Sequence, residues 1–373
     1  MRIVLDAAGG DNAPEQPVRG AVLAARQLGC EIVLTGPAQA IDAELAKHRT
    51  QGLRLSVVDA PEVIEMNERP AQAVRRKTRS AHVVGLRMVR DRQADAFVSA
   101  GHSGATMAAA TLILGRIRGI ERPALAAMFP SRKQMFLLLD IGATTDCKPE
   151  YLLQFAQMGS LYAERAFGYR NPRVALLANG EEASKGDRLV QAAYPLLRQS
   201  GLNFVGNAEP KDALVGCVCD VLVCDGFVGN LFIKQAQAVV KLVLSLAQDE
   251  TLRWLPAGLA AGLLPSAFLT LFGRRGVRWG GLLGTFGAAP ALLGSVLVPP
   301  LLRVRRKTDY RFYGGEPLLG VKGVAIVAHG KSDAAAIAMA IRQAAEAVEK
   351  GAVTGIAEVI APQASLVVEP QVV

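Results

Sequence analysis

Four glycine-rich turns carry most of the side chains in this chain that can do chemistry. Small residues let the backbone of such a turn approach a ligand, and a helix that follows offers exposed amide groups to an anion. The candidate binding and catalytic residues are Gly9, Gly10, Asp11, Asn12, Gly101, His102, Ser103, Gly104, Glu181, Lys185, Asp225, Gly226 and Asn230. We expect an anion site, although a tight turn that needs only glycine and a capping side chain explains the first turn equally well.

Two of the turns hold side chains that carry or can acquire a positive charge. In residues 179–187 two carboxylates precede Lys185, and a compact ammonium group at the start of a helix suits a phosphate. His102 is either a proton donor or a neighbour that only caps its helix, and the sequence leaves both interpretations open. A fifth glycine-rich turn covers residues 313–317.

Several motifs of common enzyme classes are missing. The chain has no G-x-G, no G-x-x-x-x-G-K-[ST] and no G-x-S-x-G, which excludes the usual dinucleotide fingerprint, the P-loop and the nucleophile elbow. The four histidines have no zinc-ligand spacing with the cysteines, and we interpret Cys217 and Cys219 as core residues of a strand. We therefore expect no metal and no other cofactor, and direct handling of phosphate.

The turns must be positioned by a parallel sheet, because short β-rich runs alternate with segments of helical periodicity. Strands are expected over residues 2–5, 31–34, 54–58, 96–99, 124–129, 135–139, 173–177, 221–224 and 323–328. Helices are expected over 14–28, 71–92, 105–116, 150–167, 187–199, 230–248 and 333–348. Most of these strands are continuous apolar runs, as in a sheet covered by helices on both faces. Ligands bind such sheets where strands end and helices begin.

Residues 251–308 interrupt this pattern. The segment has eight basic and no acidic residues, which leaves 34 basic against 33 acidic residues elsewhere, so the net charge of +9 is local and does not indicate nucleic-acid binding. Residues 254–273 and 279–302 are uncharged and long enough to span a bilayer, but contain many glycines and prolines. We favour a hydrophobic hairpin on a membrane surface. Membrane spans and helices buried in the core or at a dimer interface are the alternatives.

The composition predicts a folded protein in a reducing compartment. Of the 373 residues, 51% are hydrophobic and 20% are charged, which excludes disorder. Five irregularly spaced cysteines and an N-terminus without a leader pattern predict a cytoplasmic location. We expect one catalytic domain over 1–250 and 309–355, the hairpin over 251–308, and a mobile tail over 356–373.

At these turns the sequence resembles the bacterial acyl-carrier-protein:phosphate acyltransferase family of phospholipid synthesis. The matching stretches follow the family order along nearly the whole chain, which makes the resemblance specific. They cover residues 6–14, 63–70, 99–108, 139–160, 179–186, 223–230, 313–323 and 328–333.

The resemblance implies transfer of a long-chain fatty acyl group from acyl carrier protein to inorganic phosphate. It also implies a three-layer α/β/α fold similar to phosphotransacetylases and isocitrate-dehydrogenase-like proteins, a homodimer, peripheral attachment to the inner face of the cell membrane, and a downstream acyltransferase that receives the acyl phosphate. Lys185 and Asn230 match the residues implicated in catalysis in the family. In this interpretation Lys185 neutralises the phosphate and the Asn230 amide stabilises the oxyanion.

The chain also departs from the family pattern. His102 and Ser103 replace an Asn-Thr pair, so a titratable ring replaces an amide. A basic cluster replaces a Lys-rich stretch and either docks the acidic carrier protein or is a solvated face; it consists of Arg75, Arg76, Lys77 and Arg79. Two other functions stay open at this point: a phosphotransacetylase that uses short acyl-CoA, and a membrane scaffold of lipid synthesis.

Overall fold

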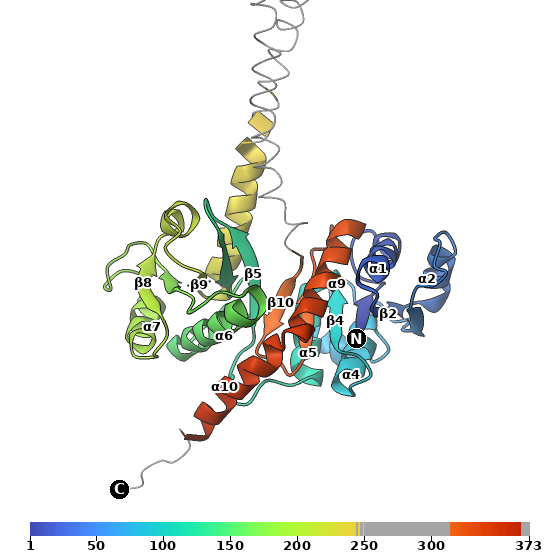
Figure 1. Ribbon diagram of the computed structural model, residues 1–373, viewed down its shortest axis with the longest axis horizontal. Helices are drawn as coiled ribbons and strands as arrows, with labels where there is room; N and C mark the ends of the chain where they lie inside the picture. The colour runs from blue at the N-terminus through green and yellow to red at the C-terminus, as the bar shows by residue number, and fades with distance from the viewer. Residues whose placement is uncertain (244, 247–248, 250–313, 367–373) are drawn as a thin grey trace, which may run out of the picture. The chain divides into compact units, whose positions relative to one another are not determined.

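The computed structural model describes residues 1–243, 245–246, 249 and 314–366 (Figure 1). The chain divides into two compact units, Met1–Leu231 with Tyr310–Val373, and Phe232–Asp309. The first unit contains the sheet and every site residue that the sequence predicts. The expected hairpin over 251–308 belongs to the second unit and lies outside the described residues.

An eleven-stranded sheet forms the centre of the first unit, in the order β3-β2-β1-β4-β11-β10-β5-β6-β9-β7-β8. It has two parallel blocks, β3-β2-β1-β4-β11 and β6-β9-β7-β8, joined through β10 and β5, which pair antiparallel with their neighbours. The strands are β1 (Arg2–Asp6), β2 (Glu31–Gly36), β3 (Leu55–Asp59), β4 (Ala96–Ser99), β5 (Ala124–Pro130), β6 (Met135–Leu139), β7 (Val174–Leu177), β8 (Phe204–Ala208), β9 (Val221–Val223), β10 (Glu316–Leu319) and β11 (Val324–Val327).

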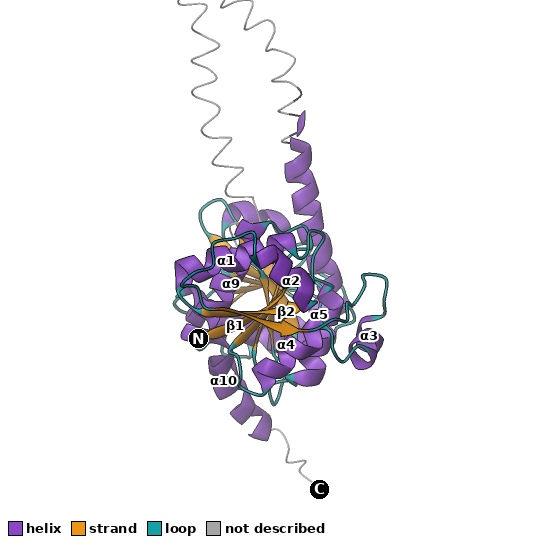
Figure 2. Ribbon diagram, turned by 90° about the vertical axis from the view of Figure 1, so that its right-hand side faces the viewer, coloured by secondary structure: helices purple, strands orange, loops and turns teal. Residues whose placement is uncertain are grey.

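Helices cover both faces of this sheet, which explains why its central strands are apolar throughout. Every residue of β4, β7 and β9 is buried. Figure 2 shows α1 and α9 on one side of β1 and β2 and α4 on the other side. The helices are α1 (Glu15–Leu28), α2 (Ala38–Leu45), α3 (Pro70–Arg76), α4 (Ala81–Arg90), α5 (Ser103–Ile113), α6 (Pro149–Phe167), α7 (Arg188–Arg198), α9 (Ala334–Glu349) and α10 (Ala352–Leu366), and a further helix begins at residue 226. The predicted three-layer α/β/α fold is confirmed.

The expected helix over 71–92 is in fact two helices, α3 and α4. The chain leaves the helix at Lys77, whose φ is −92° and ψ 74°. The Lys77 ammonium donates to the Glu68 carboxylate and to the Val63 carbonyl, and the Ser80 hydroxyl donates to the Lys77 carbonyl at 2.8 Å. These tertiary bonds hold the break, and helical periodicity on either side does not reveal it.

The C-terminal region also differs from the expectation. Residues 356–366, assigned by the sequence to a mobile tail, continue helix α10, because Ile356 and Ile360 are buried in the main core. Strands β8 and β10 and helix α2 are further elements that were not predicted from the sequence. Among the described residues no helix is both long and apolar enough to span a membrane.

Candidate active site

The loop after β6 is organised by one buried carboxylate, Asp140. Its Oδ1 accepts hydrogen bonds from the backbone N–H groups of Leu125 (2.9 Å), Gly142 (3.1 Å) and Ala143 (3.0 Å), and its Oδ2 accepts from Thr144 (2.6 Å). Burial raises the pKa of Asp140 to about 6, and the amide hydrogen bonds limit the rise. Asp140 is not among the site residues predicted from the sequence. An available signal was an aspartate within two residues of the end of an apolar strand and within two residues of a following glycine, as at Asp225.

The turn after β9 packs directly on the Asp140 loop. Asp225 caps the helix that begins at residue 226, because its Oδ1 accepts from the N–H groups of Phe227 (2.9 Å) and Val228 (3.0 Å). A Cβ added at Gly226 would lie 2.8 Å from Asp140 Oδ2 and 2.8 Å from the Thr144 carbonyl. Glycine at this position is therefore required by the close approach of helix and loop.

Asn230 lies one turn into the same helix, at its exposed side. Its Nδ2 lies 3.6 Å from the position that a Cβ on Gly142 would occupy, and Gly142 has a φ of 143°. The Asn230 amide therefore lies close to the backbone of the Asp140 loop at Gly142. Because Asn230 is exposed, its N–H groups are accessible to a ligand.

Lys185 comes from the turn after β7. The turn is closed by a bond from Gly186 N to Asn179 Oδ1 (2.9 Å) and by one from Lys185 N to the Glu182 carbonyl (3.0 Å). The Asn207 Nδ2 donates to the same Glu182 carbonyl at 2.8 Å. Lys185 and Glu181 are both exposed. The Lys185 stem lies over Gly180, where an added Cβ would be 2.7 Å from its Cγ.

Strand order brings these three turns to one edge. β6, β9 and β7 are adjacent and parallel, so the turns that hold Asp140, Asn230 and Lys185 all follow carboxyl ends. This is the edge where ligands of parallel α/β sheets bind. Lys185 offers an ammonium group at this edge and Asn230 a side-chain amide, and both residues are exposed.

The other predicted turns follow β1 and β4 in the other parallel block. A Cβ added at Gly9 would lie 2.7 Å from Gly101 N, so these two turns touch through their glycines. Gly10 has a φ of 104°, which glycine adopts without strain. Asp11 N donates to the Gly330 carbonyl at 2.8 Å, so the turn after β11 joins the group. Asn12 accepts through its backbone carbonyl from Gln16 N at 3.0 Å.

The second of these turns leads into helix α5. Ser103 is its first residue, and Thr106 N donates to the His102 carbonyl at 3.0 Å. The N–H groups of Ser103, Gly104 and Ala105 in the first turn of this helix have no intrahelical acceptor and can donate to an anion. His102 Nε2 lies 3.3 Å from the Glu68 carbonyl, which only accepts, so this nitrogen carries the proton. Gly104 packs on Pro70, where an added Cβ would be 2.8 Å from Cγ.

The two groups of turns belong to strand blocks that run in opposite directions. Six strand-to-strand steps separate β1 from β9. Among the described residues no hydrogen bond links the two groups.

Comparisons with known proteins place the chain in a family. Residues 1–277 and 285–354 match the family described as "fatty acid synthesis protein". A phosphate acyltransferase of Herpetosiphon aurantiacus is 56% identical over 363 residues, covering 96% of this chain and 98% of that protein. The chain belongs to this phosphate acyltransferase family. A second member, from Pelotomaculum thermopropionicum, is 46% identical over 94% of this chain and 92% of its own length.

Solved structures share the fold of this phosphate acyltransferase family member at low sequence identity. A phosphotransacetylase from Streptococcus pyogenes superimposes with a TM-score of 0.58 and 17% identity, covering 94% of each chain. A branched-chain phosphotransacylase from Enterococcus faecalis gives a TM-score of 0.53 at 12% identity and covers 93% of this chain and 99% of its own. These likenesses confirm the fold class that the resemblance implies.

Two carboxylates, Glu68 and Asp59, offset part of the charge of the basic cluster of this phosphate acyltransferase family member. Arg76 and Lys77 both pair with Glu68, at 2.6 and 2.5 Å, and Arg79 pairs with Asp59 at 3.1 Å. Arg75 is exposed at the end of α3. Arg76 and Arg79 are exposed as well, whereas Lys77 is half-buried.

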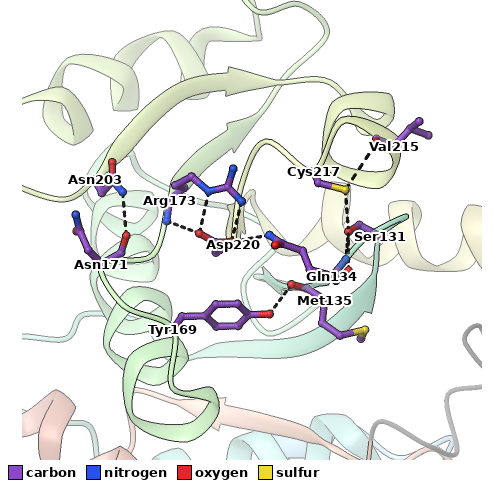
Figure 3. A network of polar contacts seen from close by, with 10 residues as sticks. All are labelled: Ser131, Gln134, Met135, Tyr169, Asn171, Arg173, Asn203, Val215, Cys217 and Asp220. Atoms are coloured by element: carbon purple, nitrogen blue, oxygen red, sulfur yellow. Dashed lines mark hydrogen bonds and ion pairs between the residues drawn. The ribbon is translucent and has the colours of Figure 1, made fainter.

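A separate polar network lies at the opposite, amino ends of β6, β7 and β9 (Figure 3). Arg173 Nη2 and Nε contact the two oxygens of Asp220 at 3.0 and 3.1 Å, and Gln134 Nε2 donates to Asp220 at 2.6 Å. Cys217 Sγ lies 3.2 Å from Ser131 Oγ. Cys217 and Cys219 are buried, as the sequence predicts, but they precede β9 and do not belong to a strand. In the described part of the chain no three His, Cys, Asp or Glu side chains form a metal-binding cluster.

Proposed function

We propose that this protein transfers a long-chain fatty acyl group from acyl carrier protein to inorganic phosphate and so supplies acyl phosphate for phospholipid synthesis. The observation that carries the proposal is the 56% identity with a phosphate acyltransferase over 96% of the chain. The placement of Lys185 and Asn230 at the carboxyl ends of neighbouring parallel strands supports it.

The reaction joins a phosphate dianion to a thioester carbonyl, so the enzyme must overcome repulsion and fix two reactants in line. A phosphate oxygen attacks the carbonyl carbon, the new C–O bond forms, and the C–S bond breaks. The phosphate proton leaves with the carrier-protein thiolate as a thiol. Holding both reactants lowers the barrier by roughly 7–11 kcal/mol in favourable cases.

Lys185 is the candidate phosphate-binding residue at the carboxyl ends of β6, β9 and β7. Its exposed ammonium is carried by a turn that three hydrogen bonds close. The N–H groups of the first turn of α5, together with the Ser103 hydroxyl, are proposed as further donors to phosphate oxygens. Further residues are proposed to shape this anion site, and they are Gly9, Gly10, Asp11, Asn12, Gly101, His102 and Gly104.

Asn230 is the candidate donor to the oxyanion that develops on the thioester. Its Nδ2 is positioned by a helix that Asp225 caps and by the loop that Asp140 holds. One such donor typically contributes about 2.7–4 kcal/mol to the transition state. Gly226 allows the start of this helix to pack closely against the Asp140 loop. Glu181 lies in the same turn as Lys185 and is included in the proposed site.

The location and the partners of the protein are proposed as well. We propose a homodimer at the inner face of the cell membrane, in the cytoplasm, with residues 251–308 as the membrane contact. Arg75, Arg76, Lys77 and Arg79 are proposed to receive the acidic carrier protein, and a downstream acyltransferase is proposed to consume the acyl phosphate. The charge pattern of the sequence supports the membrane contact and the carrier-protein surface, and the homodimer and the downstream enzyme are proposed from the family resemblance.

The test is acyl phosphate formation by the purified protein. Long-chain acyl carrier protein is incubated with and without inorganic phosphate, and acyl phosphate is trapped with hydroxylamine. Lys185→Ala and Asn230→Ala should each lower kcat by about 100-fold or more, because each removes a charge or donor from the transition state. Consumption of acyl carrier protein that does not depend on phosphate would reject the proposal. Full activity of both variants would reject the residue roles.

Acetyl-CoA in the same assay separates the alternatives. A phosphotransacetylase would prefer the short acyl-CoA, and a scaffold would act on neither substrate. The control variant is Lys133→Ala, since Lys133 is exposed and follows β5 rather than β7. We expect it to retain the activity of the parent protein.

A further inference from the structure

Three polar side chains from separate elements meet in the core beneath the turns after β1 and β4. They are Asp6 of β1, Ser99 of β4 and His82 of α4, and their exposed fractions are 1%, 0% and 4%. Ser99 Oγ lies 2.7 Å from Asp6 Oδ2 and 3.3 Å from His82 Nε2, and His82 Nε2 lies 3.7 Å from Asp6 Oδ2. Buried polar groups on three elements are expensive unless they are fully hydrogen-bonded.

The donors and acceptors available in this cluster determine the direction of each hydrogen bond. Ser99 has one proton, which it donates to the Asp6 carboxylate. Its oxygen also accepts from Gly101 N at 3.0 Å. The remaining lone pair can only accept, so His82 must hold its proton on Nε2 and donate it to Ser99. The hydroxyl then uses its full capacity of one donor and two acceptors.

The cluster is tied directly to the backbone of both turns. Asp6 Oδ1 accepts from Ala8 N at 3.0 Å, and Ser99 accepts from Gly101 N. A Cβ added at Gly101 would lie 3.1 Å from both Asp6 Oδ2 and His82 Cε1. A Cβ added at Gly9 would lie 2.5 Å from Asp6 Oδ2. The backbones of the two turns therefore pack directly against these three side chains.

We propose that His82 is a positioning residue which, through Ser99 and Asp6, holds the turns after β1 and β4 in the arrangement that binds a phosphate group. The inference rests on the proposed function, because it assigns the phosphate subsite of that reaction to these turns. His82 itself does not touch the ligand. Its effect is to fix the orientation of the Ser99 hydroxyl and, with it, of the Gly101 amide at the entry to α5.

The surroundings of His82 agree with a neutral ring that donates. Burial lowers the pKa of His82, the charge of Asp6 opposes this effect, and nearby His102 adds to it. The Phe97 ring of β4 lies against the imidazole, with centroids 6.1 Å apart. A neutral ring has one N–H, and Ser99 is the acceptor that the geometry gives it.

The experiment measures KM for inorganic phosphate and kcat separately in His82 variants. His82→Leu should raise the phosphate KM by about three- to tenfold, the size expected for one lost hydrogen bond, and change kcat by less than about twofold. His82→Gln keeps an N–H donor near the Nε2 position and should restore most of the affinity. Val83→Ala removes buried volume from the neighbouring position of α4; it should lower Tm and leave the phosphate KM unchanged.

A double-mutant cycle tests whether His82 acts through Ser99. Ser99→Ala should raise the phosphate KM, and adding His82→Leu to it should cause no further increase. Independent, additive effects of the two substitutions would overturn the proposal. So would an unchanged phosphate KM in His82→Leu, or an equal rise in Val83→Ala.

A direct binding measurement separates this inference from the proposed function. Inorganic phosphate is titrated into the parent protein with NMR of the ¹⁵N-labelled His82 imidazole, and into the parent and the His82 variants with calorimetry, and neither titration requires an acyl substrate. We expect a protonated Nε2 and a phosphate-dependent shift of its signal. If acyl phosphate formation fails but this shift and the loss of affinity persist, the proposed function is rejected and the inference stands. A proton on Nδ1 would overturn the inference alone.

Discussion

At the scale of single residues, burial raises the pKa of two carboxyl groups, Asp140 and Glu316. Asp140 at the end of β6 collects four backbone N–H groups, and Glu316 begins β10 beside β11. Burial raises the pKa of Glu316 to about 7, and the charge of Asp140 adds to the rise. A carboxyl group with a raised pKa makes the folded state less stable when it ionises.

Glu316→Gln should therefore alter the pH dependence of stability. The carboxyl has an ordinary pKa of 4.5, so its contribution to stability falls as pH rises from about 4.5 and levels off above about 7. The variant should unfold at a higher Tm than the parent at about pH 8 and at an equal Tm at about pH 4. Thermal unfolding followed by circular dichroism across pH measures this. Exposed Glu358→Gln is the control, and parallel curves for Glu316→Gln and the parent would contradict the expectation.

At the scale of elements, the helix that begins at residue 226 and the Asp140 loop act as one unit. Asp225 caps the helix, and Gly226 and Gly229 let it approach the loop. A Cβ added at Gly229 would lie 2.0 Å from the Asp140 carbonyl. The position of Asn230 therefore depends on glycines that do no chemistry themselves.

Gly229→Ala should separate helix and loop and so displace Asn230. Overpacking of this kind typically costs about 1–3 kcal/mol of unfolding free energy, and we expect a large loss of kcat because positioning is lost. Urea unfolding and the acyl phosphate assay measure the two effects. Gly216→Ala is the matched control, since the nearest atom to an added Cβ there is at 3.4 Å. Equal stability and activity in Gly229→Ala and the parent would rule out this tight contact.

At the scale of the whole molecule, the C-terminal helices close the core of the first unit. α10 packs on α6 and α9, and α9 packs on α1. Chain segments from both ends of the sequence therefore complete one α layer over the sheet. The two parallel blocks share this layer, so their stability should be cooperative.

Ile356→Ala tests this closure. Ile356 is fully buried, so the cavity should cost about 2–5 kcal/mol of unfolding free energy. A single, earlier transition in urea, seen by both fluorescence and circular dichroism, is the expected result. Val359→Ala on the exposed side of the same helix should leave the transition in place. No change in Ile356→Ala would mean that α10 does not stabilise the core.

Local features of the fold are predictable from the sequence. Apolar runs such as residues 135–139 correspond to strand β6, and glycine-rich turns are found after β1, β4, β7 and β9. These patterns depend on neighbouring residues, since backbone conformation and capping are local needs. The short strand β10 was missed because Glu316 and Pro317 do not resemble a strand, and its neighbours β11 and β5 determine its pairing.

The sequence by itself determined the turns, the residue types in them, and the family. Only the tertiary structure decided which turns share an edge: Lys185 and Asn230 belong to one parallel block, and Gly9 and Gly101 to the other. It alone revealed that Asp140 organises a loop and that Asp6, Ser99 and His82 meet. Strand order, strand direction and buried polar clusters depend on contacts between segments far apart in the chain, and composition and spacing carry little information about such contacts.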